Sequence, residues 1–170
     1  MPAMVAATDP PRVAHTITVR MGDCAVAGGT TLLRCVGLGS CLAITIFAPG
    51  QQLAALAHCM LPERDGGEGD AGKYVDDAVP HLVAKLRAAG AREPFTATLV
   101  GAASMFPGLG AGFVRDIADA NLIAARAVLT SCAVPIRAQD VGGHIGRSIL
   151  VDPATQRVVV HTIRDGDRCL

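Results

Sequence analysis

A cysteine and a histidine in this chain have the types and the spacing of a nucleophile and its base. Cys41 ends the segment GLGSC, where Gly39 lets the backbone approach a ligand and the N–H groups of Ser40 and Cys41 could bind an oxyanion. His58 belongs to a second segment, AHCMLP. Because an imidazole beside a thiol can take its proton, these residues predict nucleophilic catalysis with a thiolate–imidazolium pair as the reactive form.

Two β-rich segments are expected to bring this cysteine and histidine together. Segments 41–48 and 52–58 flank the dipeptide Pro49-Gly50, which is typical of a turn. A hairpin symmetric about this dipeptide pairs Cys41 directly with His58, with their Cβ atoms about 4.5–5.5 Å apart. The alternative is that Cys41 is a small buried apolar residue and that His58 is a hydrogen-bonded histidine of the core.

The remaining thiols form no recognisable framework. The chain has six cysteines and no CxxC pair: Cys24, Cys35, Cys41, Cys59, Cys132 and Cys169. Neither a disulfide framework nor zinc-binding spacing is therefore expected. A metal cluster that adds Cys35 and Cys59 to the pair is an alternative, although strand alternation directs Cys59 away from His58. We expect no metal and no cofactor.

Composition excludes several classes of function. The 15 basic and 15 acidic residues give a formal net charge of zero, and aromatic residues make up only 3% of the chain. We therefore expect neither a nucleic-acid partner nor an anionic membrane surface. The longest apolar stretch, residues 36–48, is shorter than the roughly 20 residues of a membrane-spanning helix. Residues 1–13 lack the features of an export signal, which predicts a disordered leader and a cytoplasmic protein.

The order of expected elements indicates an α+β protein with a mixed sheet. Apolar alternation predicts strands first, then a helix over 73–89, a strand over 95–101, a helix over 116–130 and three closing strands. This order lacks the regular alternation that builds a doubly wound parallel sheet. We expect one domain over 14–163 and a flexible tail over 164–170.

Five segments, taken in this order, resemble the CheD family of chemoreceptor glutamine deamidases. They are GLGSCLAI, AHCMLP, GKYVDDAV, GAASMF and DVGGHIGRS. The resemblance extends over residues 14–160 and implies a single domain of mixed β-sheets, packed in layers and flanked by two main helices.

The resemblance also implies an activity. It predicts a protein-glutamine glutaminase that deamidates particular glutamines on the cytoplasmic helical domain of methyl-accepting chemotaxis receptors, giving glutamate and ammonia. The family's nucleophile falls on Cys41 and its base on His58, with the oxyanion on the turn at Gly39 and Ser40. The CheC phosphatase is a further candidate partner.

Three positions depart from the family pattern. Relatives commonly carry a threonine six residues before the catalytic cysteine, where it orients the histidine, and this chain has Cys35 there. A thiol is a weaker hydrogen-bonding group than a hydroxyl, so slower catalysis is expected. The chain also reads GAASMF where relatives usually have GGA, and of an IGxRN pattern only Ile117 and Asn121 remain.

Two other functions stay open at this point. The chain could be a regulatory module that binds the receptor or CheC with the same fold and weakened catalysis. It could also hydrolyse methyl esters at the same receptor sites, because amide and ester hydrolysis share their acyl chemistry.

Overall fold

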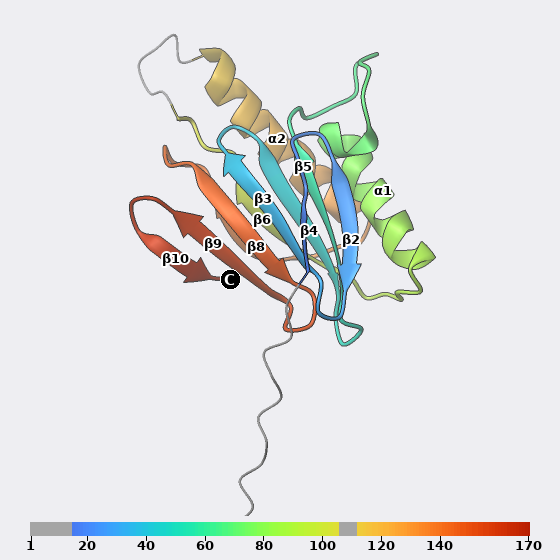
Figure 1. Ribbon diagram of the computed structural model, residues 1–170. Helices are drawn as coiled ribbons and strands as arrows, with labels where there is room; N and C mark the ends of the chain where they lie inside the picture. Colours follow the sequence, from blue (N-terminus) through green and yellow to red (C-terminus); the bar gives the residue numbers. More distant parts are fainter. Residues whose placement is uncertain (1–14, 106–111) are drawn as a thin grey trace, which may run out of the picture.

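The computed structural model describes residues 15–105 and 112–170, apart from the side chains of residues 112–116. The predicted leader over 1–13 lies outside the described residues. Within the described part, the chain forms two five-stranded sheets and two long helices. Figure 1 shows how these elements are arranged.

The first sheet has the strand order β1-β3-β8-β9-β10. Its strands are β1 (Thr16–Thr18), β3 (Leu32–Leu38), β8 (Arg147–Asp152), β9 (Arg157–Thr162) and β10 (Gly166–Cys169). β1 is parallel to β3, and the other neighbours are antiparallel. The sequence predicts a flexible tail over 164–170, but the structure has β10 there, because this segment turns back and pairs with β9.

The second sheet has the strand order β2-β5-β4-β6-β7. Its strands are β2 (Cys24–Gly28), β5 (Leu53–Cys59), β4 (Leu42–Ala48), β6 (Thr96–Gly101) and β7 (Ile136–Val141). β7 runs parallel to β6, while the other pairs are antiparallel. Both sheets are therefore mixed, as the sequence predicts.

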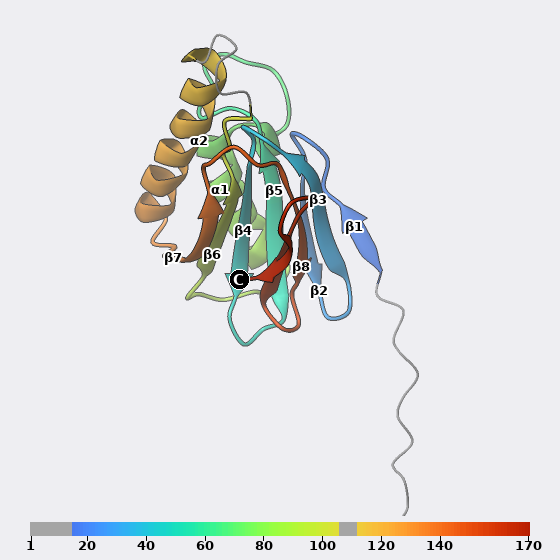
Figure 2. The same cartoon turned by 90° about the vertical axis from the view of Figure 1, so that its left-hand side faces the viewer.

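The helices cover one face of the second sheet. A short 3₁₀ turn, η1 (Ala71–Lys73), precedes α1 (Val75–Ala88), and α2 (Gly112–Ser131) follows β6. α1 packs on β5, β2 and β4, and α2 packs on α1 and β4. The first sheet covers the opposite face, so the layers are sheet, sheet and helices (Figure 2). This confirms the predicted α+β class. No helix in the described part is both long and apolar enough to cross a membrane.

Alternation along β4 and β5 separates two cores. Leu42 and Ile44 of β4 pack in a core against the helices, whereas Ala43 and Phe47 pack in a core between the two sheets. Because successive side chains of a strand point to opposite faces, the parity of a residue number decides which core it enters. We call the second of these cores the intersheet core.

The β4–β5 hairpin has a different register from the predicted one. Its paired residues run from Leu42↔Cys59 to Ala48↔Leu53, so four residues, 49–52, form the turn instead of two. Gly50 and Gln52 both take left-handed conformations there, with φ of 75° and 54°. The direct pairing of Cys41 with His58 is therefore wrong.

Candidate active site

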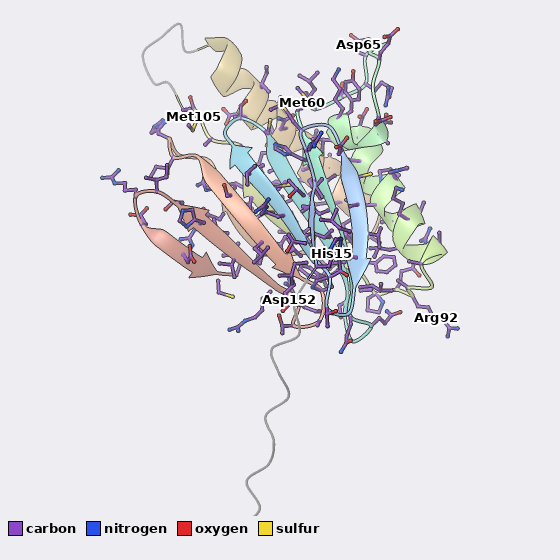
Figure 3. All side chains as sticks on the ribbon, in the orientation of Figure 1. His15, Met60, Asp65, Arg92, Met105 and Asp152 are labelled. Atoms are coloured by element: carbon purple, nitrogen blue, oxygen red, sulfur yellow. The ribbon has the colours of Figure 1, made fainter. Side chains whose placement is uncertain are left out.

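The turn between β3 and β4 carries the chain from the first sheet to the second and ends at Cys41. Gly37 has a φ of 72°, a left-handed conformation that glycine adopts without strain. Gly39 is required for a different reason: the Met105 side chain packs closely against it, and a Cβ at position 39 would lie 3.2 Å from Cγ of Met105. Met105 and Met60 mark this end of the sheets in Figure 3, and Asp152 lies at the opposite end.

The segment after β6 fixes the backbone of this turn. The N–H of Ala103 donates to the carbonyl of Gly39, and the N–H of Ala102 donates to the carbonyl of Cys41, both over 2.8 Å. A Cβ on Gly101 would overlap the Cys41 carbonyl oxygen. The nucleophile candidate is therefore positioned by backbone contacts from a segment that is more than 60 residues away in sequence.

Two further segments of the family resemblance border the same turn. In DVGGHIGRS, the carbonyl of Gly143 accepts from the N–H of Ser104 over 2.8 Å, and His144 Nδ1 lies 2.7 Å from the Ser104 carbonyl oxygen. Arg147 begins β8, where its nearly buried guanidinium binds Asp140 over 3.1 Å. These residues pack beside the turn. Arg147 has a structural role there, because its ion pair with Asp140 joins β8 to β7.

Cys41 is half-buried, and its side chain packs against the intersheet core. Burial raises the pKa of its thiol, and the thiol's contact with its own backbone N–H partly opposes this rise. Within the described chain, the Cys41 N–H donates no hydrogen bond to another backbone group. Ser40 likewise donates none from its N–H. Among the described residues, neither of these two N–H groups therefore has a backbone acceptor.

His58 enters the same core as Cys41, although it does not face it directly. His58 pairs with Ala43, which lies two residues beyond Cys41 on β4 and so on the same face. A diagonal of this kind separates the Cα atoms by about 7–8 Å, still within reach of a long side chain. The two-residue shift in register therefore keeps both side chains on one face and lengthens the distance between them.

Burial determines the charge state of His58. Its side chain is only 2% exposed, and among the described residues neither ring nitrogen has a hydrogen-bond partner. Desolvation lowers the pKa of the imidazole, whereas the nearby Val19 backbone and the Asp23 carboxylate act in the opposite direction. The pKa of the Cys41 thiol is raised, so both shifts favour the neutral thiol and the neutral imidazole over the predicted thiolate–imidazolium pair.

Cys35, at the position expected to orient the histidine, is fully buried in the intersheet core. Burial and the neighbouring Cys41 raise the pKa of its thiol to about 12, so it keeps its proton at neutral pH. The Cys35 thiol donates a hydrogen bond to the carbonyl of Val19 over 3.5 Å. In the described chain Cys35 therefore makes no hydrogen bond to His58, although both side chains lie beside Val19.

The Cys/His metal cluster considered above is not formed. Cys59 points into the core against the helices, on the opposite face of β5 from His58. Among the residues that the structure describes, no three potential ligands from His, Cys, Asp and Glu come together. The strand-alternation argument against Cys59 is confirmed.

Sequence reasoning missed one buried polar residue beside the pair. Asn121 of α2 is completely buried, and its Nδ2 donates to the carbonyls of Ser40 and Met60, each over 3.1 Å. Two local signals mark it: it is retained in the IGxRN pattern of the family resemblance, and it shares a helix face with the apolar Ala118 and Ala125. The contacts span 81 and 61 residues in sequence, so helical periodicity alone could not predict them.

A groove of about 400 Å³ opens beside the turn. Gly39 and Met105 line one part of it, and Ile163 and Arg164 line another. The Ile163 side chain is 99% exposed and Met105 is 38% exposed, so the groove has apolar groups facing solvent beside the turn that leads to Cys41. Such a surface fits an approaching polypeptide better than a small polar metabolite.

Comparison with known proteins identifies one family that this chain matches. The family model described as CheD chemotactic sensory transduction matches residues 60–162. The Chemoreceptor glutamine deamidase CheD of Halalkalibacterium halodurans is 34% identical over 156 residues, which cover 89% of this chain and 96% of that protein. The protein of the same description from Thermotoga maritima is 32% identical over 151 residues, covering 88% and 94%.

A third relative is described as a probable chemoreceptor glutamine deamidase CheD. It comes from Geobacillus kaustophilus and is 35% identical over 154 residues, covering 88% of this chain and 93% of its own length. Matches at this identity over nearly the full length of each protein, together with the family model, establish the relationship. The chain belongs to the CheD family of chemotactic sensory transduction proteins.

Proposed function

We propose that this protein deamidates glutamine side chains on the cytoplasmic helical region of chemoreceptors, and that it does so in the cytoplasm. The observation that carries the proposal is that Cys41 and His58 lie on the same face of the β4–β5 pair, beside backbone N–H groups that have no backbone acceptor in the described chain. The relatives' descriptions supply the substrate class. The exposed apolar groups of the neighbouring groove suit a helical protein surface.

In the first half of the reaction, the neutral imidazole of His58 accepts the proton of the Cys41 thiol. The sulfur forms a bond to the carboxamide carbon, and the carbonyl π electrons move onto the oxygen. The N–H groups of Ser40 and Cys41 stabilise that oxyanion. Starting from neutral groups suits this step, since the proton then moves only as the substrate carbon is attacked.

The second half releases both products. His58 gives its proton to the amide nitrogen, the C–N bond breaks and ammonia leaves with a thioester on Cys41. Water, deprotonated by His58, then attacks the thioester carbon, and the C–S bond breaks to give glutamate. The thiolate recovers its proton from the imidazolium, so the cycle requires neither metal nor redox cofactor.

Mass spectrometry of a receptor cytoplasmic fragment tests the proposal. Wild type should convert specific glutamines to glutamate, and Cys41→Ala should abolish the conversion. Cys169→Ala is the matched control, because Cys169 is exposed on β10 and should leave the rate unchanged. Conversion that persists in Cys41→Ala would refute Cys41 as nucleophile, and no conversion by wild type would refute the deamidase activity.

One observation favours a second candidate function. Among the described residues, the ring nitrogens of His58 have no hydrogen-bond partner and Cys35 donates to Val19 instead, which is what a protein with weakened catalysis would have. Such a protein would bind the receptor, or CheC, as a regulatory module. Binding of the receptor fragment by wild type without deamidation, with turnover appearing in Cys35→Thr, would identify this function.

The same assay distinguishes methyl-ester hydrolysis from glutamine deamidation. A receptor fragment carrying glutamate methyl esters offers the same acyl carbon with a better leaving group. Release of methanol by wild type but not by Cys41→Ala would add esterase activity at the same residue. Glutamine conversion without methanol release would restrict the activity to amides.

A further inference from the structure

A single buried carboxamide joins the two strand ends that carry the reactive pair. Nδ2 of Asn121 donates one N–H to the carbonyl of Ser40 and the other to the carbonyl of Met60. Ser40 immediately precedes Cys41, and Met60 follows His58 by two residues. Asn121 therefore contacts both halves of the candidate site through the backbone, from the helix side of the second sheet.

The contact with Ser40 fixes the orientation of the peptide that contains the Cys41 N–H. In a trans peptide the carbonyl and the following N–H point in opposite directions. Because Asn121 holds the Ser40 carbonyl toward α2, the Cys41 N–H is directed to the other face, where the intersheet core and the Cys41 side chain lie.

We propose that Asn121 is a positioning residue that holds the Cys41 N–H toward the oxyanion formed when the thiol attacks an acyl carbon. The inference rests on the proposed function for the identity of the natural substrate. The orientation of the Cys41 N–H should nevertheless matter for any acyl group that Cys41 attacks. Asn121 itself touches neither the substrate nor the reacting sulfur in this scheme.

The pattern of hydrogen bonds supports a role beyond stability. Oδ1 of Asn121 is buried and has no hydrogen-bond partner among the described residues. A buried unpaired acceptor lowers the stability of a protein. The protein therefore carries a destabilising group at this position together with the two N–H donors that orient the strand ends.

Two reactions at Cys41 isolate this role. Acylation by p-nitrophenyl acetate forms a bond from sulfur to the acyl carbon, passes through an oxyanion and expels p-nitrophenolate. Alkylation by iodoacetamide displaces iodide without any oxyanion. Both rates can be followed by mass spectrometry of the peptide that contains Cys41. Only the first reaction needs an oriented Cys41 N–H.

The test compares wild type with Asn121→Ala and the milder Asn121→Ser. Removing an oxyanion donor outright costs about 10²–10³ in rate, and we expect misalignment to slow acylation by about 10- to 100-fold. Alkylation should change by less than about threefold, because it depends on the thiol alone. Thr98→Val is the matched control, since Thr98 is also a fully buried polar residue and accepts a hydrogen bond from Arg137.

The control should lose some stability in urea but keep the wild-type ratio of acylation to alkylation. Unchanged acylation in both Asn121 variants would overturn the inference, as would an equal loss of acylation and alkylation, which would indicate a general distortion of the thiol. Deamidation of the receptor fragment is measured in parallel. If wild type acylates but does not deamidate, the proposed function fails, and the acylation-to-alkylation ratio still decides the role of Asn121.

Discussion

Cys35 donates its thiol hydrogen to the carbonyl of Val19 over 3.5 Å, and this bond leaves His58 without a side-chain partner in the described chain. The imidazole lies beside the same carbonyl. The Val19 carbonyl therefore accepts from the buried thiol, while neither ring nitrogen of the candidate base has a hydrogen-bond partner among the described residues. A side chain with a stronger and more versatile polar group at position 35 could donate to Val19 and also accept from the imidazole.

Cys35→Thr is therefore expected to speed deamidation. A hydroxyl can accept the imidazole N–H, which fixes the tautomer whose other nitrogen faces Cys41. We expect kcat to rise about 3- to 10-fold with little change in KM. Cys35→Ala is the control, because it lacks the hydroxyl and should not exceed wild type. Equal rates for the threonine and alanine variants, measured on the receptor fragment, would refute this orienting role.

The pH dependence of thiol labelling should follow the burial of Cys41. Because burial raises the pKa of this thiol, its alkylation rate should reach half-maximum above the ordinary thiol value of about 8.5. Iodoacetamide labelling of the Cys41 peptide between pH 6 and 11 measures this directly. Rapid labelling at neutral pH would instead mean a preformed thiolate, and would contradict the neutral resting pair.

The lowered pKa of His58 should make stability depend on pH. The unfolded chain binds the proton more readily than the folded one, so unfolding free energy is greatest above the ordinary histidine pKa of about 6.5. It should fall as pH decreases from there to the lower folded pKa, and then level off. Urea midpoints at pH 7.5 and 5 measure the change, and His58→Leu should reduce the difference. An identical pH dependence in that variant would contradict the assignment.

The fold was accessible from the sequence to the extent that local patterns determine it. The apolar runs of β4 and β5 correctly indicated an antiparallel hairpin, and the order of elements indicated mixed sheets. The hairpin register was not accessible, because Pro49-Gly50 fits both a two-residue turn and the observed four-residue turn. Strand periodicity still kept Cys41 and His58 on one face, since the shift was by two residues.

In the candidate site, too, local sequence patterns predicted some features and could not predict others. Cys41 and its glycine turn have a local sequence signal, whereas the contacts of Asn121 with Ser40 and Met60 depend on where α2 lies on the second sheet. The bond from Cys35 to Val19 joins β3 to the residue after β1 through a parallel strand pair. No periodicity in a single segment encodes such contacts, because they depend on the packing of distant elements.

Ala102→Gly should stabilise the protein. Ala102 has a φ of 52°, a left-handed conformation in which its Cβ is strained. After the extra chain entropy of glycine is subtracted, we expect a gain of about 0.5–1 kcal/mol in unfolding free energy. Ala103→Gly is the control and should be destabilising, because its φ is not positive. A loss of stability in Ala102→Gly would refute the strain argument.

Gly101→Ala should displace the candidate nucleophile. Gly101 and Gly90 both have positive φ values, 118° and 90°, so alanine at either position is strained by about 1–2 kcal/mol. Only at Gly101 would the new Cβ also overlap the Cys41 carbonyl oxygen, whereas Gly90 has open space around it. Gly101→Ala should therefore cost about 1–3 kcal/mol more than Gly90→Ala in urea denaturation. It should also slow deamidation by at least about tenfold, since a small displacement of a reacting group is costly. Equal effects of the two substitutions on stability and rate would mean that the backbone around Cys41 adjusts freely, and that its position is not set by β6.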